Sequence, residues 1–368
     1  MDILLSLPIL SYFSSASLTS WSTSLNLLFF YMTWSTLVLS HDPIKVEIVG
    51  TTALRIALWL IPSLFFLAFD TFLPSLSESL KFGGASALPP RNASSIAKLA
   101  GLALLNLTLE TALEAVVSVV LAIALKTPVF HTSTTLPLPW QMIKHISLLF
   151  AAREVLTYYV HRHLLHGQPA PSVSVSKSPG GSRFPKRSQT RRGGRLARLH
   201  AASPSHARSA PPFSLLAKAD HPLPHFLHRF LPVYLPALLL HPGGLHLLTY
   251  LLFVALTTLE ETLAMSGYAV IPGIVMGGIA RRTAVHHCGG DGNFGNWGVL
   301  DWVHGTSLGR DVVGDLHAEA GKHGLRERPE GAVDDAGGAV RDGIQGLRKG
   351  KRRGSGVKKG GRSGNSGE

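Results

Sequence analysis

The chain contains a single cysteine, Cys288, and few charged residues. One cysteine excludes an intrachain disulfide framework and any zinc or iron–sulfur site built from four cysteines. Charged residues make up only 15% of the 368 residues, whereas ordinary soluble domains hold about 25%. The apolar fraction of 45% and the mean hydropathy of +0.22 agree with this deficit. The composition therefore favours a membrane protein, in which any metal ion must be bound by His, Asp or Glu.

Acidic residues are missing from two basic segments, residues 167–199 and 348–362, each of which holds eight Lys or Arg. The rest of the chain has 19 basic and 22 acidic residues, so the net charge of +13 belongs to these two segments. Both are rich in Gly and Ser, and we expect them to be disordered and attracted to anionic lipid rather than to nucleic acid. Basic segments also favour the cytosolic side of a membrane. The residues that they flank are therefore expected to face the cytosol.

The metalloprotease motif HExxH is absent, which argues against a histidine-based zinc hydrolase, our third and least favoured alternative. The patterns Gly-x-Ser-x-Gly, at residues 305–309, and Gly-x-Gly-x-x-Gly, at residues 290–295, do occur, but neither follows a predicted strand, as a nucleophile elbow or a dinucleotide fingerprint would. We therefore expect any redox chemistry to draw its electrons from a separate chain.

Long apolar runs predict an all-α, polytopic membrane bundle. We expect spans at Leu25–Ser40, residues 51–73 and residues 98–125. Residues 136–160 are apolar but interrupted by charge, which indicates an interfacial or partly inserted helix. Residues 222–263 are interrupted by Pro and Gly near the middle, which indicates a helical hairpin.

Polar residues recur within the third of these spans. Asn106, Glu110 and Glu114 are spaced by four and therefore share one helical face. Carboxylates inside an apolar span are costly and usually face a protein interior or a wet cavity. We expect a polar seam packed against a neighbouring helix, and a face that contacts substrate or protons is the alternative.

Histidine is abundant, with 18 residues, and it gathers in short stretches. Residues 158–166 read YYVHRHLLH directly after an apolar stretch, so His161 or His163 can bind one metal ion together with His166. Such clusters between hydrophobic segments predict a metal site at a membrane surface. The later stretches are His200 and His206, then His221, His225 and His228, then the pair His286 and His287.

The flanking residues resemble the fatty acid hydroxylase/sterol desaturase superfamily over residues 145–310. Residues 161–166 fit its first motif, HRxxxH after aromatic residues. Residues 206–208 (His-Ala-Arg), Phe213 and residues 220–222 (Asp-His-Pro) follow the order of its second motif. Ala207 stands where that motif has a paired histidine.

The third motif of the superfamily is matched mainly in its flanks. The pair His286 and His287 is followed by Asn-Phe at residues 293–294 and by Asp-Trp-Val-His-Gly-Thr at residues 301–306. Two glycines at residues 289–290 stand where a later histidine pair is expected, and His304 replaces a phenylalanine.

The resemblance implies a histidine-ligated, non-haem di-iron centre in a cytosol-facing cap. Dioxygen would then hydroxylate or desaturate a fatty acyl, sphingoid or sterol lipid in the endoplasmic reticulum membrane, with electrons from a b-type cytochrome and its reductase. Glu154, Asp220 and Asp301 are candidates to orient ligand histidines, although we expect each to be an ordinary solvated carboxylate. The candidate metal ligands are His161, His163, His166, His200, His206, His221, His286 and His287.

The departures from the motifs leave other readings open. The site could hold a single iron, or it could recruit ligands from His221, His225 or His304. The protein could also be a non-catalytic membrane scaffold with a degenerate metal site. In every case we expect an N-terminal membrane region at residues 1–135, a histidine-motif domain at 136–310 with an insert at 167–199, and a polar, basic, disordered tail at 311–368.

Overall fold

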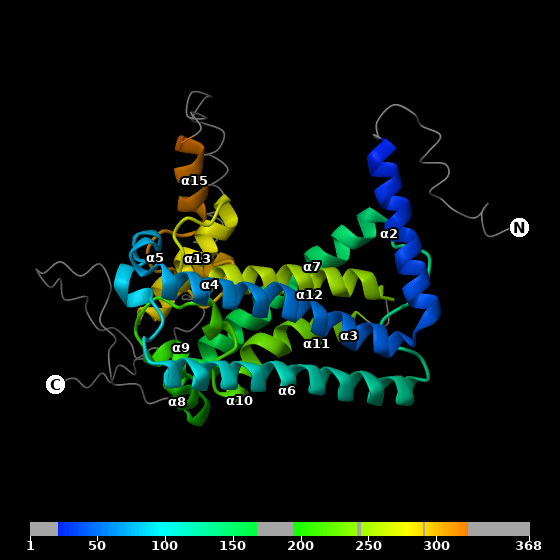
Figure 1. Cartoon of the computed structure of the whole chain (residues 1–368), viewed down its shortest axis with the longest axis horizontal. Coiled ribbons are helices and arrows are strands. Elements are labelled where there is room, and N and C mark those ends of the chain that lie inside the picture. The colour runs from blue at the N-terminus through cyan, green and yellow to red at the C-terminus, as the bar shows by residue number, and fades with distance from the viewer. Residues whose placement is uncertain (1–20, 168–193, 241–243, 290, 323–368) are drawn as a thin grey trace, which may run out of the picture.

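A computed structural model describes residues 21–167, 194–240, 244–289 and 291–322. These residues form helices joined by loops, with two isolated β-bridges and no β-sheet among them. The expected all-α bundle is therefore confirmed (Figure 1). Its main helices are α2 (Trp21–Ser40), α3 (Pro43–Arg55), α4 (Ile61–Phe72), α6 (Ala93–Leu125), α7 (Pro139–Tyr159), α11 (Leu231–Leu239), α12 (Leu247–Ala264) and α13 (Ile274–His287).

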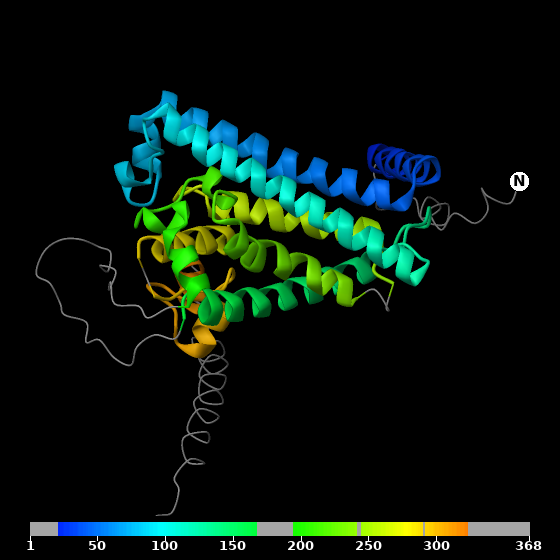
Figure 2. The ribbon, with the colours of Figure 1, turned by 90° about the horizontal axis from the view of Figure 1, so that it is seen from below.

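Helix α12 lies at the centre of the bundle, where it packs against α3, α7, α11 and α13. Figure 2 shows the blue and cyan N-terminal helices along one side of the molecule and the later, green to yellow helices beneath them. The apolar core between the helices includes Trp34, Leu149 and Phe253, all buried. Phe130 stacks on Tyr250 of α12 with ring centroids 4.1 Å apart. The core thus ties the first and second halves of the chain together.

Three helices in the described part of the chain are long and apolar enough to cross a membrane: Pro43–Phe72, Ala93–Leu125 and Leu247–Ala264. The first two leave large apolar side chains outside the protein, such as Phe65 at 65% exposure and Ile123 at 74%. Exposed apolar surface on helices of this length is suited to lipid. Helix α7 is not among the three, and its expected interfacial character stays a prediction.

Two predicted spans differ from the structure in extent. The first, expected at Leu25–Ser40, lies within the longer helix α2 (Trp21–Ser40). The second span begins at Pro43 rather than at residue 51, because Asp42 caps the helix by accepting a hydrogen bond from the Ile44 amide at 2.9 Å. A proline in the first helical turn loses no hydrogen bond, so it suits this start.

The expected hairpin at residues 222–263 has unequal arms. Its first arm is built from three short elements, α10 (Pro222–His225), η5 (Phe226–Phe230) and α11, and its second arm is α12. Residues 241–243, where two of the predicted breakers fall, lie outside the described residues.

Residues 168–193 of the first basic segment and the whole of the second lie outside the described residues. Helix α8 (Arg195–Ala202) begins inside the predicted insert at 167–199, and α15 (Val312–Lys322) lies inside the predicted tail at 311–368. Asp315 of α15 accepts a hydrogen bond from Arg282 of α13 at 2.7 Å and pairs with Arg281. The bundle therefore extends beyond the boundary expected at residue 311.

The polar face of α6 forms the expected seam against neighbouring elements. Glu110 contacts Lys218 Nζ at 2.6 Å and His225 Nε2 at 2.7 Å, and Glu114 contacts Arg55 at 2.6 Å. All five residues are buried, and we refer to them as the charge-paired seam. Nearby, Asn106 donates hydrogen bonds to the carbonyls of Lys218 and Asp220 at 2.6 and 2.8 Å. The prediction of an interhelical polar seam is confirmed.

Candidate metal centre

The first histidine motif lies on a π-helical turn, η3 (Val160–Leu165), that continues α7. In an α-helix, residues five apart point about 140° away from each other. In a π-turn the backbone instead bonds from residue i to residue i+5, and the His166 amide donates to the His161 carbonyl at 2.9 Å. The two rings therefore lie on the same side of the helix, edge to face, with centroids 4.7 Å apart. The local winding explains why a five-residue spacing produces a pair of neighbouring imidazoles.

The second pair, His200 and His206, comes from two short helices that meet at an angle. Helix α8 ends at Ala202, and α9 (Pro204–Ala207) begins directly after Ser203. Pro204 suits the first turn of a helix but cannot continue the preceding one. The break brings the rings of His200 and His206 to a centroid distance of 3.9 Å.

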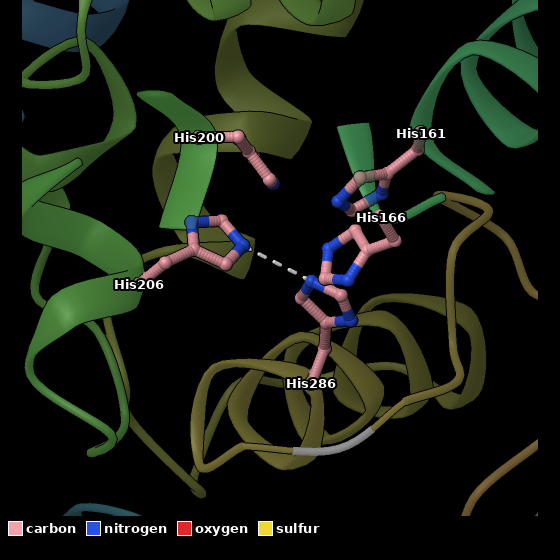
Figure 3. A group of neighbouring side chains, drawn as sticks. All are labelled: His161, His166, His200, His206 and His286. Atoms are coloured by element: carbon pink, nitrogen blue, oxygen red, sulfur yellow. Dashed lines mark hydrogen bonds between the residues drawn. The ribbon is translucent and has the colours of Figure 1, made fainter. Parts of the chain in front are cut away.

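His286 completes the group from the end of α13. Its ring centroid lies 4.6 Å from that of His161 and 4.9 Å from that of His166. Its Nε2 lies 3.1 Å from His206 Nε2 (Figure 3). Segments more than 100 residues apart in the sequence thus converge on one point at the end of the bundle where α8, α9 and α13 gather (Figure 1).

These five side chains form what we call the histidine cluster. Each offers one nitrogen, these nitrogens lie within 4.8 Å of one another, and every residue is buried. Two nitrogens bound to one ion at about 2.1 Å lie at most about 4.2 Å apart. The observed spread exceeds that limit by only a few tenths of an ångström, so the cluster suits one ion after a small inward shift, or two ions. The members are His161, His166, His200, His206 and His286.

Backbone carbonyls fix the protonation of two members of the cluster. His161 Nδ1 lies 2.9 Å from the Phe294 carbonyl, and His286 Nδ1 lies 2.8 Å from the Gly292 carbonyl. A carbonyl oxygen only accepts, so in both rings Nδ1 carries the proton and donates it. In the neutral ring, Nε2 then presents a lone pair.

His206 is held in the same tautomer by a side-chain relay. The Ser205 hydroxyl donates to Asp220 Oδ1 at 2.5 Å and accepts from His206 Nδ1 at 2.8 Å. The Nε2 lone pairs of His206 and His286 therefore face each other across 3.1 Å. Two facing lone pairs repel unless a cation lies between or beside them. The arrangement fits a metal ion, for which a ligand histidine commonly donates its other ring nitrogen to a carbonyl or carboxylate.

Burial keeps two members of the cluster, His161 and His206, uncharged. Burial, reinforced by His286, His166 and His200, lowers the pKa of His161 well below its usual range. Burial, reinforced by His200 and His287, does the same to the pKa of His206. Within the described residues, His161 Nε2 is buried without a hydrogen-bond partner. These rings are therefore neutral near pH 7 and available as metal ligands.

Buried carboxylates organise the loop that supplies the two carbonyls. Asp301 accepts from the amides of Phe294 and Gly295 at 2.9 and 2.7 Å and from the Thr306 hydroxyl at 2.7 Å. Glu154 accepts from the Trp297 amide at 2.9 Å. Glu154, Asp220 and Asp301 are all buried, so the expectation of solvated carboxylates was wrong for each. They hold backbone and hydroxyl groups that in turn orient the histidines.

Three of the eight candidate ligands lie outside the cluster. His163 is exposed and stacks on Tyr159, with ring centroids 5.9 Å apart. His221 is exposed and caps α10 by accepting from the Leu223 amide at 3.3 Å. His287 is buried beside the cluster, with its ring centroid 4.6 Å from that of His206.

One buried histidine beside the cluster, His228, was not among the candidate ligands. Its ring centroid lies 4.1 Å from that of His161, and it lies on a second π-helical turn, η5. The run of His221, His225 and His228 in the sequence indicated that this segment could supply a metal ligand. The spacing did not indicate which of the three side chains points toward the histidine cluster. His225 instead joins the charge-paired seam. His304 stacks on Tyr158 with centroids 5.0 Å apart.

Comparison with known families gives one match, between residues 146–306 and the fatty acid hydroxylase family. The matched stretch contains all five members of the histidine cluster, and it coincides closely with the range in which the motifs were recognised. No solved structure matches the chain.

Proposed function

Because residues 146–306 match the fatty acid hydroxylase family, we propose that this protein is a membrane oxidoreductase that uses iron and dioxygen to hydroxylate or desaturate a lipid. The observation that carries the proposal is the buried cluster of five histidines. The cluster offers one nitrogen from each side chain, and contacts outside the cluster fix the protonation of His161, His206 and His286.

The five cluster histidines would hold the iron, which when bound supplies the redox chemistry that activates dioxygen. The protein residues do the rest. The carbonyls of Phe294 and Gly292 and the Ser205 hydroxyl keep the ligand protons on Nδ1. His228 and His287 extend the imidazole lining and are available to a second ion.

A small polar cavity adjoins the cluster. It has a volume of about 40 Å³, and its lining includes His161, His228, His286, Glu260 and Glu261. A space of this size accommodates one or a few water-sized molecules. It provides room for dioxygen and water beside the ligands.

The lipid, the electron donor and the cellular site are further parts of the proposal. A fatty acyl, sphingoid or sterol substrate would come from the membrane, and electrons from a b-type cytochrome and its reductase. The endoplasmic reticulum membrane, with the cluster facing the cytosol, accords with the basic segments that flank it. A cluster at one end of membrane-length helices accords with a surface-accessible centre.

Turnover of labelled oxygen tests the proposal. Purified protein, reconstituted with membrane lipids and a reduced b-type cytochrome under ¹⁸O₂, is expected to release lipids that carry one ¹⁸O atom or have lost two hydrogens. The double variant His161→Ala/His166→Ala is expected to produce neither, while His163→Ala, which alters an exposed histidine in the same motif, retains activity. Iron-loaded protein that leaves every lipid class unchanged would support the scaffold reading instead.

A further inference from the structure

A second site lies in a pocket between α6 and the segment formed by α10 and η5. The pocket has a volume of about 500 Å³, within the range of small-molecule sites. Its walls are mostly apolar and include Leu109, Leu113 and Phe226. No member of the histidine cluster lines it. The pocket is therefore a site separate from the candidate metal centre.

The pocket opens toward the lipid-facing surface. Val116 of α6 and Leu223 of α10 line it, and their side chains are 59% and 45% exposed. Helix α6 is one of the three helices long and apolar enough to cross a membrane. A ligand that enters here would come from the hydrocarbon region, so it must have an apolar body.

Two buried polar side chains line the same pocket and leave one atom each without a partner. Asn106 is 1% exposed and His225 is 3% exposed. Within the described part of the chain, Asn106 Oδ1 and His225 Nδ1 have no hydrogen-bond partner. A buried polar atom without a partner costs roughly 1 to 3 kcal/mol. Both atoms would be satisfied by a ligand group inside the pocket.

The neighbouring contacts determine what these two atoms can do. Asn106 Nδ2 donates to the carbonyls of Lys218 and Asp220, so its Oδ1 is the end that accepts. Glu110 pairs with Lys218 at 2.6 Å and lies 3.9 Å from Arg55. Two cations keep it a carboxylate, and His225 Nε2 therefore donates to it at 2.7 Å. In the neutral ring, His225 Nδ1 then accepts.

The charge balance around the pocket selects a neutral ligand. The seam contributes two carboxylates, Glu110 and Glu114, and two cations, Arg55 and Lys218. These charges already compensate one another, and an additional buried charge would be costly. Two acceptors in a pocket with apolar walls are best matched by a hydroxyl donor on an uncharged apolar body.

We propose that this pocket binds a neutral, hydroxyl-bearing membrane lipid, with its hydroxyl at Asn106 and His225 and its apolar body between α6 and η5. Hydrogen bonds connect this pocket with the candidate metal centre through Asp220. The backbone of Asp220 accepts from Asn106, and its side chain accepts from Ser205, which contacts His206.

Binding of radiolabelled lipids to the full-length protein in detergent tests this proposal. Cholesterol and a ceramide serve as two hydroxyl lipids of different body, and cholesterol methyl ether serves as a matched probe without the donor. At least one of the two hydroxyl lipids is expected to bind saturably. If cholesterol binds, its methyl ether is expected to bind about tenfold more weakly, because the ether has no hydroxyl donor. Failure of both hydroxyl lipids to bind, or equal affinity for cholesterol and its ether, overturns the proposal.

A matched pair of variants locates the site. Ala112 lines the pocket, so Ala112→Trp fills it, whereas Val120→Trp places the same side chain two turns further along α6, outside the residues that line the pocket. Ala112→Trp is expected to weaken binding at least tenfold and Val120→Trp to leave it unchanged. Equal binding by the two variants overturns the assignment to this pocket. Monodispersity in detergent shows whether both variants are folded, and it does not require bound iron. The lipid-binding comparison therefore does not depend on the proposed oxygenase activity.

Discussion

The histidine cluster and the charge-paired seam are both buried and polar, but they differ in how their groups are compensated. In the seam, the carboxylates of Glu110 and Glu114 meet the cations of Arg55 and Lys218. In the cluster, only imidazoles meet, and the lone pairs of His206 and His286 face each other. The charges of the seam compensate one another within the protein, whereas the cluster gathers neutral metal-ligating nitrogens that could hold a cation. A buried group of ligating nitrogens without charged partners is therefore the better indicator of a metal site than a set of paired charges.

The largest expected effect comes from breaking the seam. Glu110→Ala removes the carboxylate from Lys218 and His225 and leaves a buried cation uncompensated. We expect the free energy of unfolding to fall by roughly 3 to 5 kcal/mol, measured as thermal unfolding in detergent. The exposed carboxylate of Glu78 provides the control, since Glu78→Ala is expected to be nearly neutral. Equal stability of the two variants would show that the seam does not hold the helices together.

A second variant tests the support of the cluster. Asp301→Ala removes the acceptor for the amides of Phe294 and Gly295 and frees the carbonyl that orients His161. Loss of such support typically weakens metal binding by about 10- to 100-fold. Competition for iron with a chelator of known affinity measures the change, and Asp301→Asn, which keeps one acceptor oxygen, should fall between the wild type and Asp301→Ala. Unchanged iron affinity in Asp301→Ala would contradict the orienting role.

A smaller change is expected for the Asp220–Ser205–His206 relay. Ser205→Ala removes the acceptor for His206 Nδ1, and we expect iron affinity to fall by about tenfold. Ser266→Ala is a matched control, because Ser266 is equally buried but donates to the Leu263 carbonyl. If both serine variants bind iron as the wild type does, the relay does not control the tautomer of His206.

The smallest effect concerns a buried histidine outside both regions. Burial, with a contribution from His131, lowers the pKa of His246 to about 4, while its Nδ1 accepts from the Leu248 amide at 3.1 Å. The unfolded chain protonates this histidine near pH 6.5, so stability is lost as the pH falls below that value. His246→Asn keeps a capping side chain and should remove about 1 kcal/mol of the stability loss between pH 7 and 5.5. Parallel pH profiles of thermal unfolding for wild type and variant would contradict this assignment.

The sequence predicted the helical bundle and the seam because both follow from periodicity. Asn106, Glu110 and Glu114 recur at helical spacing, and their partners were required by burial in an apolar span. The span at Leu25–Ser40 was expected from hydropathy alone, and the structure has the longer helix α2 (Trp21–Ser40) there. The start at Pro43 depends on the cap at Asp42.

The membership of the cluster was only partly predictable, because it depends on local winding and on distant contacts. The π-turn that aligns His161 with His166 also directs His163 outward. A second π-turn carries His228 inward, while His225, three residues earlier, turns to Glu110. Asp220 is buried because it contacts Ser205 and Asn106, which come from other segments of the chain. Asp301 is buried because it binds amides on the other side of its own loop. Spacing in the sequence does not report any of these directions.

Metal analysis of detergent-purified protein tests the central claim most directly. The wild type and His163→Ala are expected to contain at least one iron per chain, and His161→Ala/His166→Ala to contain almost none while remaining folded and monodisperse. This outcome would place the iron at the histidine cluster. Folded, monodisperse wild-type protein without iron after reconstitution, or iron that persists in the double variant, would contradict the account.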